Sequence, residues 1–105
     1  MKNPLEMLGN IIDDPERRQK IQLSAEYGEI MWRVEEALTN LISDGGQLSQ
    51  KMHRRISELL HRRDAIREVY LKAEETPPKK GTEMLTEVVE MIKELEKDIK
   101  RLADS

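Results

Sequence analysis

The sequence predicts an all-α protein, an antiparallel bundle of three long helices with a short N-terminal helical segment. Along three separate stretches, apolar residues recur at alternating spacings of three and four, which is the pattern of helices that pack along a narrow seam. Apolar residues make up 37% of the 105 residues and charged residues another 37%. The chain also has no Phe and one Trp. This composition fits long helices sharing a seam better than a thick multilayer core.

We expect one domain over residues 15–105, after a short apolar lead over residues 1–14. Its helices are predicted at about residues 15–43, 47–75 and 82–103. The first helix begins at a start signal in which Asp14 is the N-cap and Pro15 is the first helical residue. It ends before two consecutive glycines, which tolerate the left-handed backbone of a helix stop. Because this turn is short, the second helix should fold back on the first.

The connection between the second and third helices is predicted over residues 76–81, with the sequence TPPKKG. Pro77 disfavours helical backbone at Thr76, and two consecutive prolines stiffen the loop. Thr82 is then expected to cap the third helix. The stiff loop leaves open whether the third helix packs within its own chain or swaps into a neighbour.

Each predicted helix carries an apolar stripe along its length. The stripes consist of Leu23, Tyr27, Ile30, Val34, Ala37 and Leu41 in the first helix, Met52, Ile56, Leu59, Arg63, Ile66, Tyr70 and Ala73 in the second, and Leu85, Val88, Ile92, Leu95, Ile99 and Leu102 in the third. One charged residue, Arg63, interrupts the second stripe. A guanidinium there needs a bound anion, an acidic partner on another helix or a route to solvent, because an unpaired buried charge is costly.

The first helix has a second apolar stripe almost opposite its main one. It consists of Ile21, Ala25, Gly28 and Trp32. A helix that is apolar on two faces packs between neighbours. The lead segment, the third helix or a second subunit could cover this stripe, and we therefore expect a homodimer or a larger assembly. We predict a partner-binding surface made of these four residues together with Met84 and Met91, since methionine suits adaptable helix-binding grooves.

Basic residues on the second helix form a candidate anion-binding flank. They are Lys51, Arg55, Arg62 and Arg63. The flank has no interleaved aromatic residues for stacking on bases, and the chain has a net charge of −3. We therefore expect the flank to be solvated or paired with acids of other helices, and nucleic-acid binding is the second alternative function.

Two acids on the first helix, Glu26 and Glu29, are three residues apart and share a face, an arrangement that can hold Mg²⁺ through oxygen ligands. The run from Glu26 to Trp32 resembles a helical motif of MazG-type nucleotide pyrophosphohydrolases. That resemblance implies an all-α enzyme in which paired acidic motifs on adjacent helices hold Mg²⁺ over a triphosphate. The second helix lacks the family's second acidic motif at the required spacing. On the strength of the Glu26 and Glu29 pair and this resemblance, Mg²⁺-dependent nucleotide hydrolysis is the first alternative function.

A broader resemblance covers residues 27–102 and is closest in the run LLHRRDAI at residues 59–66. The pattern of amphipathic helices, a short break and a proline-containing loop resembles the small helical-bundle chaperones of flagellar and type III export. The resemblance implies an apolar groove that binds amphipathic helices of export cargo.

Several classes of function are disfavoured by composition. The absence of Cys excludes disulfides and thiolate metal sites, and His53 and His61 are too few and too far apart for a metal site. No apolar run approaches the length of a membrane span, and no signal-peptide pattern is present, so a cytoplasmic location is expected. We expect no cofactor and no membrane partner, and we predict a non-enzymatic module that binds a partner helix or self-associates.

Overall fold

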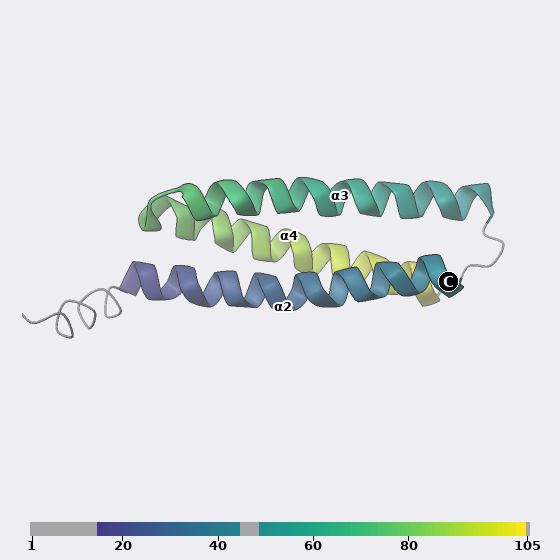
Figure 1. The fold of residues 1–105 in the computed structure, drawn as a ribbon, viewed down its shortest axis with the longest axis horizontal. Coiled ribbons are helices and arrows are strands. Elements are labelled where there is room, and N and C mark those ends of the chain that lie inside the picture. The colour runs from purple at the N-terminus through teal and green to yellow at the C-terminus, as the bar shows by residue number, and fades with distance from the viewer. Residues whose placement is uncertain (1–14, 45–48, 105) are drawn as a thin grey trace, which may run out of the picture.

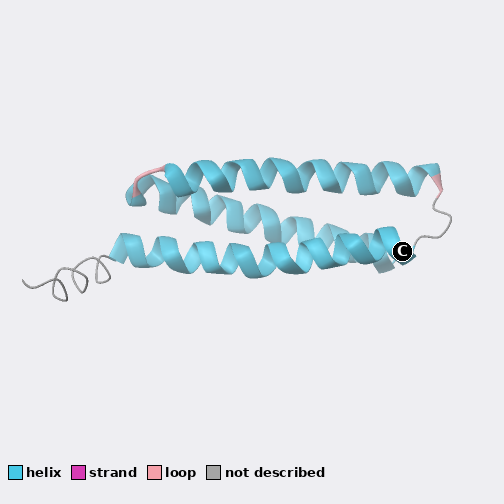
Figure 2. Ribbon diagram, in the orientation of Figure 1, coloured by secondary structure: helices cyan, strands magenta, loops and turns pink. Residues whose placement is uncertain are grey.

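The computed structural model describes residues 15–44 and 49–104, which form three helices (Figure 1). Helix α2 spans Pro15–Asp44, α3 spans Gln50–Glu75 and α4 spans Pro78–Asp104. Within these residues only short connections are not helical (Figure 2). α3 runs antiparallel to both α2 and α4, so α2 and α4 run in the same direction (Figure 1). The predicted all-α bundle is confirmed, whereas the predicted lead and the glycine turn at residues 45–46 lie outside the described residues.

Helix α4 is the helix that both others pack against. Its closest packing is with α2, it also packs along α3, and α2 and α3 approach each other much less. The apolar stripe of α4 is broad enough to face two neighbours. The buried residues of α4 are Gly81, Thr82, Leu85, Val88, Val89, Ile92, Leu95, Ile99 and Leu102. All six residues of the predicted stripe are among them, which confirms the heptad pattern in this helix.

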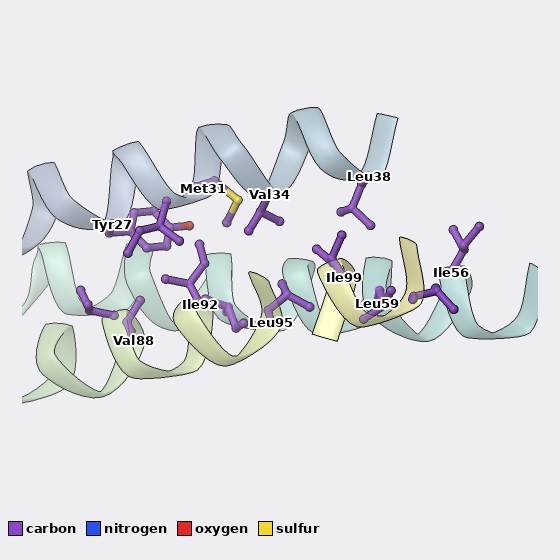
Figure 3. Packing of buried hydrophobic residues seen from close by; sticks show 14 residues of the cluster. Tyr27, Met31, Val34, Leu38, Ile56, Leu59, Val88, Ile92, Leu95 and Ile99 are labelled. Atoms are coloured by element: carbon purple, nitrogen blue, oxygen red, sulfur yellow. The ribbon is translucent and has the colours of Figure 1, made fainter. Parts of the chain in front are cut away.

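The hydrophobic core lies where the stripes of the three helices meet (Figure 3). In α2 the buried face includes Met31 and Leu38, which the predicted stripe omitted, whereas Leu23, Ala37 and Leu41 are half-buried. The difference arises because a straight helix repeats every 3.6 residues and drifts from a strict heptad. Within the described residues, no buried side-chain nitrogen or oxygen lacks a hydrogen-bond partner.

Helix α4 begins four residues before the predicted start. It starts at Pro78, a proline at the first helical position, where the missing N–H costs no hydrogen bond. Thr76 is extended, with φ −87° and ψ 143°, as expected for a residue that precedes a proline. The predicted loop over residues 76–81 is therefore wrong beyond Pro77, because the run KKG belongs to the first turn of α4.

Gly81 and Thr82 have roles that the sequence interpretation assigned differently. A Cβ on Gly81 would lie 2.9 Å from the carbonyl oxygens of Ala73 and Thr76, so the glycine permits close packing of α4 on the end of α3. Thr82 is not a helix cap, because it lies inside α4 and its hydroxyl donates to the Glu16 carbonyl at 3.3 Å. Both residues tie the α3–α4 turn to the rest of the bundle.

Helix α3 begins three residues later than predicted. Its N-cap is Ser49, whose hydroxyl oxygen accepts a hydrogen bond from the Met52 amide at 3.2 Å. Serine is a preferred N-cap because this bond satisfies one of the first amides of the helix. At the other end of α3, Lys20 of α2 donates to the carbonyl oxygens of Glu74 and Thr76 at 2.9 and 3.0 Å. A cation there also complements the negative end of the helix dipole.

Candidate functional site

The outer face of α2, defined as Ile21, Ala25, Gly28 and Trp32, is uncovered within the described residues. Trp32 is 66% exposed and Ile21 is 62% exposed, and the two small residues between them are exposed as well. The third helix, one of the three predicted covers, does not lie on this face, because α4 packs on the opposite side of α2 (Figure 3). Another predicted cover, the lead over residues 1–14, lies outside the described part of the chain.

Gly28 makes a notch at the centre of the outer face. Within the part of the chain that the structure describes, a Cβ added to Gly28 would have no neighbour within 4 Å, so packing there gives no reason for a glycine. A shallow hollow of about 510 Å³ lies here, lined by Gly28, Glu29, Trp32 and Arg33. Glycine in a helix interior is destabilising relative to alanine, so this notch lowers the intrinsic stability of α2.

The two methionines of the predicted surface lie apart from the outer face of α2. Met84 is half-buried on α4, and Met91 is 37% exposed. Met91 lines a mostly apolar hollow of about 390 Å³ between α3 and α4, together with Ala65 and Ile66. Charged residues Arg62, Glu90 and Glu94 also line it. The six predicted partner-binding residues therefore belong to more than one surface.

Arg63 pairs with an acid on a neighbouring helix. Its guanidinium donates to the Glu35 carboxylate of α2 at 3.1 Å and to Asp64 at 3.0 Å. Arg67, one turn further along α3, donates to the other oxygen of Glu35 at 3.0 Å. One carboxylate thus joins two arginines across α2 and α3, which explains how a charged residue fits in the apolar stripe of α3.

A tyrosine pair lies beside these ion pairs between α2 and α3. The rings of Tyr27 and Tyr70 are stacked, with centroids 3.9 Å apart and planes inclined by 12°. Burial raises the pKa of Tyr27 above its usual value of 10.0. Burial and the nearby Glu74 carboxylate raise the pKa of Tyr70, and that same carboxylate accepts a hydrogen bond from Ser24.

The predicted anion-binding flank of α3 is divided among acidic partners. Arg62 donates to Asp98 of α4 at 2.6 Å, and Arg101 donates to the other oxygen of Asp98 at 3.3 Å. Arg55 lines a hollow of about 250 Å³ that also contains Asp98 and Glu58. Lys51 is exposed near the start of α3. Asp98 of α4 thus interrupts the positive charge of this flank.

The predicted metal-ligand pair faces cations of α4. Glu26 lies 3.1 Å from the Lys93 ammonium, and Glu29 shares a charged groove with Lys93 and Arg33. Arg33 donates to Glu96 at 2.8 Å and thereby lowers the pKa of that carboxyl below its usual value. Among residues 15–44 and 49–104, no group of three His, Asp or Glu side chains is placed to hold a metal ion. Any magnesium site would need further ligands.

Three structural features were missed by the sequence interpretation. They are the Ser49 cap, the packing role of Gly81 and the double pairing of Glu35. A serine three residues before Met52 was a readable cap signal. In contrast, Glu35 is one of many acids in a charged sequence. Its pairing with Arg63 and Arg67 becomes visible only when the positions of α2 and α3 are known.

The described residues define an all-α protein of the three-helix bundle class. None of the helices they form is both long and apolar enough to cross a membrane. Comparison with known proteins found no matching family model, no matching curated protein and no matching solved structure. The resemblances to export chaperones and to MazG-type enzymes therefore stay predictions from sequence pattern.

Proposed function

We propose that this chain is a non-enzymatic interaction module of the adaptor, chaperone or assembly type, acting in the cytoplasm. In this proposal, an amphipathic helix of a protein partner or of a second copy binds the outer face of α2. The observation that supports it is the exposure of Ile21 and Trp32 on a helix whose opposite face already contributes to the core.

The size of the exposed side chains favours binding of moderate strength. Fully burying an isoleucine or a tryptophan side chain contributes roughly 1.5–3 kcal/mol to the free energy of association. Association costs about 4–15 kcal/mol in lost translational and rotational freedom. The outer face of α2 alone therefore supports reversible, concentration-dependent association, with charges around it setting the register.

The notch at Gly28 suits a helical partner in particular. With glycine and alanine at its centre, the outer face lets a second helix backbone approach closely between the larger Ile21 and Trp32. The apolar hollow beside Met91 offers a separate, smaller surface between α3 and α4. We assign the principal binding to α2, because the larger apolar side chains are exposed there.

Trp32 makes the proposal directly testable, since it is the only tryptophan in the chain. Its emission should shift to shorter wavelength, and iodide quenching should decrease, when the protein is concentrated or mixed with a designed amphipathic-helix peptide. The variant Ala25→Glu places a charge at the centre of the face and should abolish both changes. Ser57→Glu, at an exposed position of α3, is the matched control.

Circular dichroism should show the same helix content in the wild type and in both variants, because the changed residues are exposed. The proposal fails if Trp32 stays equally open to iodide at every protein concentration and with peptide in excess. It also fails if Ala25→Glu and Ser57→Glu weaken association equally.

A further inference from the structure

We infer that the outer face of α2 binds the same face of a second copy, with the two α2 helices antiparallel about a two-fold axis between residues 26 and 27. This inference rests on the proposed function, because it names the partner of that same surface. Three observations carry it: the order of residues along the face, the notch at Gly28 and the charges at the two ends.

The apolar residues of the outer face are self-complementary when one helix is reversed. Ile21 and Trp32 are placed symmetrically about the point midway between residues 26 and 27, and Ala25 and Gly28 are symmetric about the same point. In an antiparallel pair centred there, Ile21 faces Trp32 of the second copy and Ala25 faces Gly28. Each large exposed side chain therefore meets another large one.

The small residues then meet at the centre of the pair. Among the described residues, nothing lies within 4 Å of a Cβ added to Gly28, so their packing gives no reason for a glycine in the middle of α2. Opposite Ala25 of a second copy, the glycine allows the two backbones to approach closely at the axis. A destabilising residue in the helix interior thereby gains a structural role.

The charges at the ends of the face select the antiparallel orientation. Arg18 and Glu36 are both exposed and lie eighteen positions apart, which is five turns at about 3.6 residues per turn, so they lie on the same side of α2. Their midpoint lies within half a residue of the apolar centre. An antiparallel pair places Arg18 beside Glu36 of the second copy, and does so twice by symmetry.

A second charge pair follows the same rule on the other side of the face. Arg17 and Glu35 are also eighteen positions apart, although Glu35 is engaged by Arg63 and Arg67 of α3. A parallel pair in register would instead place the arginines of both copies side by side at one end and the glutamates of both copies at the other. Such like-charge contacts oppose association, so the charge order favours the antiparallel arrangement.

The test is a charge-reversal cycle read by sedimentation equilibrium. Arg18→Glu and Glu36→Arg should each weaken self-association about tenfold or more, since each variant turns two attractive contacts into repulsive ones. The double variant Arg18→Glu/Glu36→Arg restores opposite charges across the antiparallel pair and should return to the wild-type dissociation constant. Arg54→Glu, at an exposed position on α3, is the matched control and should have no effect.

The outcomes separate this inference from the proposed function. If the double variant is not rescued, the antiparallel register is wrong, even where Ala25→Glu still abolishes binding of the helical peptide. If the wild type stays a single chain while Trp32 is protected from iodide, a segment of its own chain covers the face, and the second copy is overturned. A wild type that stays a single chain, with Trp32 open until the peptide is added, indicates a different protein as partner.

Discussion

Helix α2 meets its two neighbours through interfaces of different chemistry. Toward α4 it presents an apolar surface, and Figure 3 shows Val34 and Leu38 pointing toward Ile92 and Ile99. Toward α3 it adds polar contacts, namely the Glu35 carboxylate between two arginines and the Ser24 hydroxyl on the Glu74 carboxylate. The α2–α4 interface is also the more closely packed of the two.

The two interfaces therefore have different roles: one mainly provides stability and the other mainly sets how the helices are aligned. Apolar burial is non-directional and increases with the area removed from water, so the α2–α4 interface should carry most of the free energy of folding. Ion pairs and ring stacks need a defined geometry but contribute little when partly exposed. The α2–α3 contacts should therefore determine the orientation of α3 on α2, while contributing little to the free energy of folding.

The largest effect is expected from truncating the apolar interface at its centre. Ile92 is fully buried, so Ile92→Ala should lower the free energy of unfolding by about 2–5 kcal/mol through lost burial and a residual cavity. Urea unfolding followed by circular dichroism measures this loss. Met91→Ala is the neighbouring control on α4 and should cost clearly less, because Met91 is 37% exposed. Equal losses in both variants would remove the distinction between the interfaces.

The next effect compares the two glycines that the structure describes. Gly81→Ala should destabilise the protein by about 1–3 kcal/mol, since its Cβ would lie 2.9 Å from two backbone carbonyl oxygens and α4 would have to shift. Gly28→Ala should stabilise it by about 0.5–1 kcal/mol, because space is open there and alanine favours the helix. Thermal unfolding at low protein concentration measures both. Shifts of the same sign would contradict the contrast.

A smaller effect is expected at the polar interface. Glu35→Gln removes the carboxylate that joins Arg63 and Arg67 to α2, and it should cost about 1 kcal/mol, since these pairs are partly exposed. Glu68→Gln, at an exposed position of α3, is the matched control and should change stability by less than about 0.5 kcal/mol. If Glu35→Gln lowered the free energy of unfolding as much as Ile92→Ala, the polar interface would contribute as much to stability as the apolar one.

The same contrast explains what the sequence could and could not predict. All six residues of the predicted α4 stripe are buried, because apolar periodicity follows the face of a helix that packs on its neighbours, although the stripe omitted Val89. The second stripe of α2 was also visible as apolar periodicity, but its residues are exposed among the described residues, so periodicity alone did not show whether they are buried. The polar contacts depend on which helices lie side by side, so the pairing of Glu35 with Arg63 required the fold. Gly81 was placed in the predicted loop because of the prolines before it, and only the packing of α4 on the end of α3 shows its close contact.

The smallest effect is a pH dependence of stability that comes from the tyrosine pair. It has no influence on the free energy of unfolding at neutral pH. The pKa of Tyr27 is raised by burial, and that of Tyr70 by burial and the Glu74 carboxylate. Because each pKa is higher in the folded chain, the unfolded chain loses these protons first. Stability is therefore fully present below the unfolded value of 10.0 and is lost as pH rises through the folded values. Urea midpoints at about pH 8 and about pH 11 should differ more in the wild type than in Tyr27→Phe/Tyr70→Phe. An equal alkaline loss in the two proteins would show that the effect does not come from the tyrosine pair.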